Sequence, residues 1–280
     1  MTLAVAAARS AVLAAAGQSD NPFVAWENLG ATATLGGTAV LADGARINAV
    51  AGTTWGFWRP NVTGTEAVLE MVLGAAVSVG FAAVAAHNIA ALGGTARWER
   101  STDGGAIWGD GGAGTVTPAD DTAIGWRMAT SGNDAARWRL RVTGLTAAAP
   151  LAVGVAFIGQ EMVFPQRCYQ GIRPPIEPTR LEGEVNVSVG GHLLGSDSVL
   201  KGGAFAMALE HLPDTFIRDV PFRAFLRHWN LRRAAFVHWR PGKYPQDLIY
   251  AWREGAAIMP DNSGPKAYMS VALDMSYYAG

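Results

Sequence analysis

The chain has 280 residues, of which 50% are hydrophobic and 16% are charged, and 22 lysines and arginines balance 23 aspartates and glutamates to a net charge of −1. A near-zero charge without basic blocks argues against nucleic acid as the main partner. Ten tryptophans and ten phenylalanines exclude a disordered chain, and the single cysteine, Cys168, excludes an internal disulfide. So few charges beside so much alanine, glycine and tryptophan favour a protein that buries its outer faces against other subunits.

Two apolar stretches are candidates for a signal peptide or a membrane span. Residues 1–20 are rich in alanine, but a positive leader is missing and Arg9 stands where the apolar core of a signal peptide belongs. We therefore expect a short arm or helix there. Residues 71–86 are uncharged but too short to cross a bilayer, and their apolar residues alternate with small ones. They predict two consecutive buried strands and no membrane span.

Residues 21–164 follow the pattern of an all-β domain. Short apolar or alternating runs are separated by glycine-rich turns such as Gly93-Gly94 and Gly111-Gly112, which is typical of a sandwich or barrel. Residues 137–142 alternate three arginines with tryptophan, leucine and valine, so they predict a strand with one apolar and one charged face. Residues 151–158 predict a buried strand.

Residues 165–178 contain four prolines and predict an extended linker between two domains. Beyond it, residues 179–280 predict an antiparallel β-sheet packed by one helix. The helix begins at Pro221 behind a cap at Asp214 or Asp219, and Phe222, Phe225, Leu226 and Trp229 form its apolar face. The expected strands are 181–189, turned by Gly190-Gly191, and then 205–209, 235–239, 248–252 and 268–277.

Motifs for chemistry are weak. Residues 109–114 match G-x-G-x-x-G, but Thr115 to Pro118 cannot open the helix that dinucleotide binding requires, so a hairpin loop is expected. The five histidines show no metal-ligand spacing. Asp110, Asp120 and Asp121 could border a calcium ion, but the ligand order of a calcium loop is absent and turn carboxylates are the simpler interpretation. We predict no catalytic residue, no metal and no cofactor.

Carbohydrate binding stays open, because Trp55 and Trp58 could stack on sugar rings from the edge of a sandwich. The alternative is that one or both belong to the core. A pair of carboxylates for sugar hydrolysis is defined by distance in space, so the sequence leaves a polysaccharide hydrolase as a further alternative.

A resemblance rests on two groups of residues in the first domain. One is His87-Asn88 after a buried strand, followed by Gly93-Gly94, Trp98 and Ser101 to Trp108; the other is Asn21-Pro22-Phe23, Leu41 to Gly44 and Trp55 to Pro60. Together they resemble the galactose-binding-like, discoidin-type jelly-roll of tail proteins in long-tailed bacteriophages. The C-terminal residues 222–229, 236–241, 244–245 and 248–252 are similar to a tail-tube type of β-sandwich with a helix.

The resemblance implies a structural protein of a phage tail tip or baseplate in the virion, without catalysis. It implies rings of identical subunits, contacts with other tail proteins and a jelly-roll that can contact host-surface glycans. The candidate glycan ligands are Trp55, Trp58, His87 and Asn88, although the last two can instead hold a turn. The candidate assembly contacts are Phe222, Trp229, Trp239 and Trp252.

Overall fold

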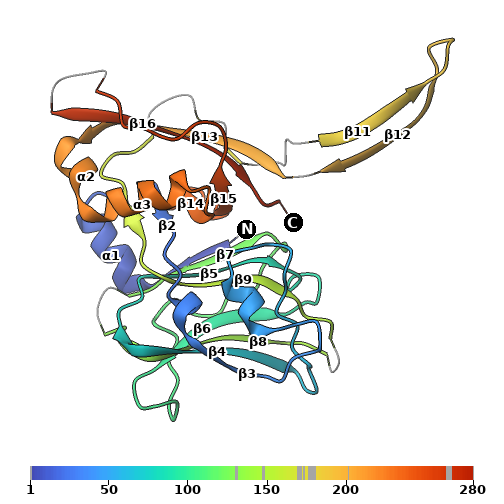
Figure 1. The fold of residues 1–280 in the computed structure, drawn as a ribbon. Helices are drawn as coiled ribbons and strands as arrows, with labels where there is room; N and C mark the ends of the chain where they lie inside the picture. Colours follow the sequence, from blue (N-terminus) through green and yellow to red (C-terminus); the bar gives the residue numbers. More distant parts are fainter. Residues whose placement is uncertain are drawn as a thin grey trace.

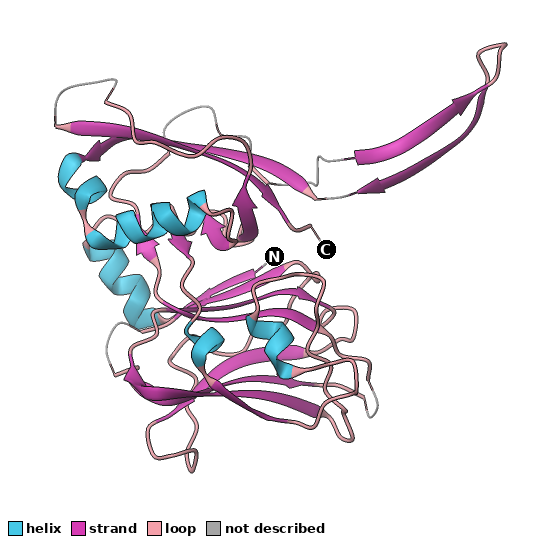
Figure 2. Ribbon diagram, viewed as in Figure 1, coloured by secondary structure: helices cyan, strands magenta, loops and turns pink. Residues whose placement is uncertain are grey.

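The computed structural model describes residues 2–129, 132–146, 149–168, 172, 174–175, 181–200, 202–262 and 267–279. The protein is mainly β, as predicted, with a jelly-roll followed by an antiparallel β-rich unit packed by helices (Figures 1 and 2). Much of the predicted linker, residues 169–171, 173 and 176–178, lies outside the described residues.

The jelly-roll consists of two four-stranded sheets. One has the order β1-β7-β5-β9, with bounds Thr2–Val5, Ala123–Arg127, Phe81–His87 and Val153–Gly159. The other has the order β3-β4-β8-β6, with bounds Thr34–Gly37, Glu66–Val77, Ala135–Thr143 and Thr95–Ser101. Two 3₁₀ helices, Leu29–Thr32 and Arg46–Val50, lie in the loops before β4. Side chains of both sheets share one core that includes Leu69, Trp98, Trp126, Trp138 and Ile158.

Alternation along β8 confirms the prediction for 137–142. Trp138, Leu140 and Val142 are fully buried, while the arginines between them face outward and pair with glutamates of the neighbouring strands. The two strands predicted within 71–86 are β4 and β5, of which β5 is buried throughout and residues 74–76 of β4 are exposed.

A third sheet has the order β10-β2-β14-β15-β16-β13, all antiparallel. Its bounds are Met162–Val163, Phe23–Ala25, Ala235–His238, Ile249–Arg253, Tyr268–Tyr277 and Gly203–Pro213. The strands predicted at 205–209, 235–239, 248–252 and 268–277 are thus found. Strands β2 and β10, however, come from the stretch predicted as jelly-roll. They are two or three residues long, so no alternation in the sequence could assign them to a sheet whose other strands all lie beyond residue 200.

The sheet β1-β7-β5-β9 is covered on both faces. Its inner face meets the jelly-roll core, and its outer face packs against the third sheet through a cluster of phenylalanines, Phe23, Phe81, Phe157 and Phe236, with ring centroids 5.3–6.0 Å apart. Strands β5, β7 and β9 are consequently buried at every position. The jelly-roll and the third sheet are therefore packed directly against each other as layers and are not two separate domains joined only by a linker (Figure 1).

Helices cover the far face of the third sheet. Helix α3 spans Val220–Asn230, and the side chain of its N-cap Asp219 accepts a hydrogen bond from the Val220 N–H at 2.8 Å. The predicted helix is confirmed, with Asp219 as its cap, while Asp214 begins a separate short helix, α2 (Asp214–Arg218). Phe222, Phe225 and Trp229 are buried against the sheet, which is the face that the i, i+3, i+7 spacing predicted.

The N-terminal segment is a strand and a helix, and it is held by an ion cluster. Strand β1 pairs in parallel with β7, and α1 spans Ala7–Ala15. Arg9 donates to Glu161 at 2.9 Å, and Glu161 also accepts from Arg127 at 2.7 and 2.9 Å. The side chains of Arg127 and Glu161 are both 1% exposed. No helix among the described residues is long and apolar enough to cross a bilayer.

One element stands apart from the layers. Strands β11 (Leu181–Val187) and β12 (Leu193–Leu200) form a hairpin that pairs only with itself within the described part of the chain. Figure 1 shows it extending well beyond the third sheet. The strand predicted at 181–189 and its glycine turn are present, but the strand belongs to an arm and not to the body of the second domain.

Candidate functional site

Trp58 belongs to the core, which corrects its place among the glycan candidates. The side chain is fully buried in the jelly-roll core, and its backbone bridges Val153 of β9 with a 2.8 Å hydrogen bond. A buried indole presents no face to a sugar, so the core alternative holds for Trp58.

His87 and Asn88 fix a loop. The His87 side chain is shut off from solvent, its Nδ1 accepts from the Ile89 N–H at 3.2 Å, and burial lowers the pKa of His87 to about 4 despite the nearby Asp121. The Asn88 amide donates to the Pro150 carbonyl at 2.9 Å and accepts from the Ala152 N–H at 2.8 Å. With both ends of the amide engaged, the turn-holding interpretation fits these residues and ligand binding does not.

The four candidate assembly residues divide in two. Phe222 and Trp229 are 1% and 0% exposed and pack inside their own chain, so they cannot contact another subunit. Trp239 is half-buried, stacks on Tyr244 and donates to Asp247 at 2.7 Å. Trp252 is also half-buried, and it faces a cavity.

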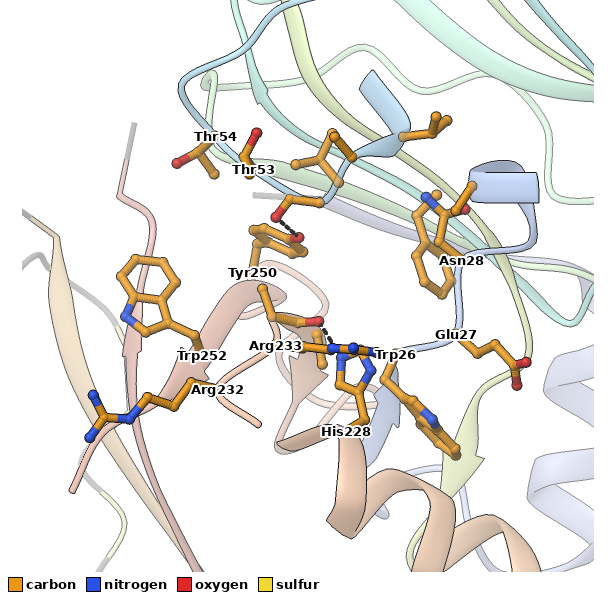
Figure 3. Close-up of a pocket in the computed structure, with 18 of the residues that line it drawn as sticks. Trp26, Glu27, Asn28, Thr53, Thr54, His228, Arg232, Arg233, Tyr250 and Trp252 are labelled. Atoms are coloured by element: carbon orange, nitrogen blue, oxygen red, sulfur yellow. Dashed lines mark hydrogen bonds between the residues drawn. The ribbon is translucent and has the colours of Figure 1, made fainter. Parts of the chain in front are cut away.

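That cavity, of about 680 Å³, lies where the jelly-roll meets the third sheet. Its wall comes from five stretches distant in sequence: residues 26–31, residues 50–55, strand β9, residues 228–235 around the turn after α3, and strand β15. Figure 3 shows Trp252 and Arg232 on one side, Trp26 and Asn28 on the other, and Tyr250 between them. We call it the seam pocket. Trp55, the remaining glycan candidate, stands at this pocket with 82% of its surface exposed.

One hydrogen bond ties the two halves of the seam pocket together. The Tyr250 hydroxyl of β15 donates to the Gly52 carbonyl of the 50–55 loop at 2.8 Å. Burial raises the pKa of Tyr250, so the hydroxyl keeps its proton and remains a donor at neutral pH. The loop that carries Trp55 is therefore held against the third sheet.

The cationic side of the seam pocket is formed by the turn after α3. Arg232 has a backbone φ of 58°, a left-handed conformation that non-glycine residues adopt at a cost, and its N–H closes the helix end on the Trp229 carbonyl at 2.9 Å. Arg232 and Arg233 are exposed, and neither forms a salt bridge with a residue that the structure describes. Burial lowers the pKa of His228, whose Nε2 lies 2.9 Å from the Ala234 carbonyl, so this histidine is neutral at pH 7.

A second cavity, of about 430 Å³, bears on the hydrolase alternative because Asp120 and Asp247 both line it. Both carboxylates are engaged by the chain itself: Asp120 accepts from the Thr122 N–H at 3.0 Å, and Asp247 accepts from Trp239. Burial raises the pKa of Asp247, and the bond from Trp239 opposes that rise.

The remaining motifs behave as turns. Gly111, Gly112 and Gly114 have positive φ in a loop that Asp110 closes through the Gly112 N–H at 2.9 Å, and a strand follows instead of a helix. Asp121 accepts from the Ala90 N–H at 2.8 Å. Within the described ranges, no group of three histidine, cysteine or acidic side chains could hold a metal ion.

Sequence reasoning missed most of the seam pocket. Trp26, Tyr250, Arg232 and Arg233 carry no motif, and the Tyr250–Gly52 contact joins residues 198 positions apart. Besides Trp55 and Trp252, which the sequence did single out, a usable signal was the arginine pair 232–233 just past the helix end, where glycine is the usual residue.

Comparisons with known proteins give distant fold likenesses only. No protein-family profile matches the chain, and no curated protein matches it. Chitosan-binding module 1 from a chitosanase/glucanase of Paenibacillus sp. IK-5 aligns at 15% identity and a TM-score of 0.41 over 48% of this chain and 99% of the module. Module 2 of that enzyme, in complex with chitotriose, aligns at 15% and 0.40 over 48% and 100%. A Ruminococcus gnavus fucosidase aligns at 12% and 0.40 over 49% of this chain and 27% of the enzyme. Likenesses at this level carry no argument about what the chain binds, and the resemblance to phage tail proteins stays a prediction.

Proposed function

We propose that the protein is a non-catalytic assembly subunit that joins further copies of itself through the hairpin β11–β12. The observation that carries the proposal is the arm itself. Val185, Val187, Val189 and Leu194 are between 56% and 111% exposed on it, and both outer strand edges lack a partner among the described strands. An isolated two-stranded hairpin is marginally stable in water, and unpaired edges invite pairing. An arm of this kind gains stability when another molecule covers it.

Charge supports a second copy as the occupant. Residues 181–200 contain Glu182, Glu184 and Asp197 and no lysine or arginine. Residues 214–233, which form α2, α3 and the turn that follows, contain five arginines and two aspartates. The exposed apolar residues Val220 (74%) and Leu231 (60%) lie in the same region, which we call the α3 face. An acidic apolar arm thus has a basic apolar counterpart on an identical chain.

A contact between the arm of one subunit and the α3 face of the next is heterologous, because two different surfaces meet. Such contacts generate rings when the rotation closes. This agrees with the position in a phage tail tip or baseplate that the sequence resemblance implies, beside other tail proteins in a virion, and that position is part of the proposal.

Size-exclusion chromatography with light scattering on the full chain tests the assembly. We expect an oligomer at micromolar concentration, and the double variant Val185→Lys/Val187→Lys is expected to weaken it by about a hundredfold through loss of apolar burial. The matched control, Ile107→Lys, changes a 75% exposed residue of the jelly-roll and should leave the oligomer intact. A wild-type chain that stays monomeric at all concentrations contradicts the proposal.

Carbohydrate binding is the second function that we propose, and Trp55 favours it. An indole that is 82% exposed at the mouth of a cavity is placed to stack on a sugar ring. Calorimetric titration with oligosaccharides tests this function, and an absence of heat with every oligosaccharide, acidic or neutral, contradicts it.

A further inference from the structure

The lining of the seam pocket carries more positive than negative charge. Of the residues that line it, only Glu27 is acidic, while Arg232 and Arg233 are cationic and His228 is neutral at pH 7. Figure 3 shows the Glu27 side chain directed away from Arg232 and Trp252. The pocket therefore offers two guanidinium groups, which point in different directions in Figure 3, and each of them suits an anionic group.

The same pocket offers flat apolar surfaces. Trp55 is largely exposed, and Trp252 and Trp26 are half-buried, the latter with a tilted contact to Phe225 at 5.4 Å between ring centroids. Indole faces pack against the C–H face of a pyranose ring. A ligand that fits must therefore combine ring faces with negative charge.

Hydroxyl-bonding groups complete the lining. The side chains of Thr53 and Thr54 line the pocket, and neither forms a hydrogen bond with another described residue. Asn28 is not free for a ligand, because its amide binds Gly30, Ala156 and Ile158 at 3.0–3.2 Å. Its role is to fix the wall, as the bond from Tyr250 to Gly52 does for the opposite loop. The pocket is thus held in shape before any ligand arrives.

From these features we infer that the seam pocket binds an acidic carbohydrate, with uronic acid units whose carboxylates pair separately with Arg232 and with Arg233 while sugar rings stack on Trp55 and Trp252. A volume of about 680 Å³ is enough for a short oligosaccharide. This inference deepens the carbohydrate-binding function proposed above by assigning its site and its ligand class.

The test is isothermal titration of the full chain with three probes of equal length: a hexamer of galacturonic acid, a neutral hexamer of galactose and a hexamer of glutamate. We expect the acidic sugar to bind at least about tenfold more tightly than either of the others, because it alone satisfies both the arginines and the indoles. Equal binding of the glutamate hexamer overturns the assignment to a sugar.

Variants locate the binding. Arg232→Gln/Arg233→Gln and Trp55→Ala are each expected to weaken binding of the acidic hexamer by about tenfold or more, since charge-assisted bonds and stacking faces are removed. The matched controls are Arg223→Gln, an exposed arginine of α3 outside the pocket, and Ile107→Ala. All five substitutions in these four variants are at exposed positions, and circular dichroism melting checks that each variant is folded.

The outcomes separate the inference from the function on which it rests. If acidic and neutral hexamers bind equally, and the pocket variants bind like the wild type, the seam pocket inference fails while carbohydrate binding stands. If no sugar binds at all, both fail.

Discussion

Two sets of arginines distinguish two regions of this protein. In the jelly-roll, which we call the closed region, the arginines pair with carboxylates of the same chain; in the α3 face and the seam pocket, which we call the open region, Arg232 and Arg233 do not. On β8, Arg137, Arg139 and Arg141 pair with Glu70, Glu99 and Glu66 at 3.0, 2.5 and 2.9 Å. Around α3, Arg232 and Arg233 face solvent without a salt bridge to any described residue. The difference teaches that charge on the jelly-roll serves the fold, whereas Arg232 and Arg233 are available to the partners proposed above.

In the closed region, the largest loss of unfolding free energy should follow from removing a buried carboxylate. Glu161→Ala leaves Arg127, itself 1% exposed, without its partner, and we expect a loss of about 3–5 kcal/mol in the free energy of unfolding. Urea denaturation measures it. The control Glu66→Ala removes a half-exposed partner of Arg141 and should cost less than about 1 kcal/mol. An equal loss of unfolding free energy in Glu161→Ala and Glu66→Ala would contradict the claim that the buried ion pair stabilises the fold more than the surface pair does.

Trp55 and Trp58 lie close together in sequence, but one is exposed in the open region and the other is buried in the closed region, so their substitution should affect stability differently. Trp58→Ala empties a site in the core and should cost about 3–5 kcal/mol of unfolding free energy. Trp55→Ala removes an exposed ring and should change stability by no more than about 0.5 kcal/mol. Thermal melts of both variants decide this, and a large loss with Trp55→Ala would place that ring in the fold.

Acid should destabilise the closed region through its buried histidines. Burial lowers the pKa of His87 to about 4, below its ordinary 6.5, so the unfolded chain binds the proton more readily between these values. Stability is therefore full above pH 6.5 and falls as the pH drops towards 4, by at most about 3 kcal/mol for this residue. Denaturation at a series of pH values should show a shallower slope for His87→Gln than for the wild type. An unchanged slope in His87→Gln contradicts the assignment.

Salt should act on the open region instead. Raising ionic strength screens exposed charges, so oligomers joined by the acidic arm and the α3 face should weaken by on the order of tenfold, which is about 1.4 kcal/mol, between low and high salt. Analytical ultracentrifugation measures the change, and the melting temperature of the subunit should move little in the same buffers. Salt-strengthened oligomers would indicate apolar contacts alone.

The predictable part of the fold followed periodicity. The period of two along 137–142 and the i, i+3, i+7 spacing of Phe222, Phe225 and Trp229 each placed an element and its buried face correctly. Such patterns are visible because one face of each element is buried and the other is exposed.

The sequence did not predict which strands and residues far apart in the chain pair or pack together. Strands β2 and β10 are too short to show a period, and burial on both faces removed the alternation from β5, β7 and β9. Tryptophan by itself also did not distinguish a core residue from a pocket residue. Trp58 and Trp229 fill cores, while Trp55 and Trp252 line a cavity. The sequence could supply the residue types of the site but not the contact that assembles it.

The central claim, that the arm of one subunit lies on the α3 face of another, can be tested directly by disulfide crosslinking. In a Cys168→Ser background, Val187→Cys on the arm and Leu231→Cys after α3 leave two exposed thiols per chain. Oxidation followed by non-reducing electrophoresis should give a ladder of covalent multimers, since Figure 1 places the arm far from its own α3. A chain that stays monomeric under oxidation, with both thiols still reactive, would contradict the account.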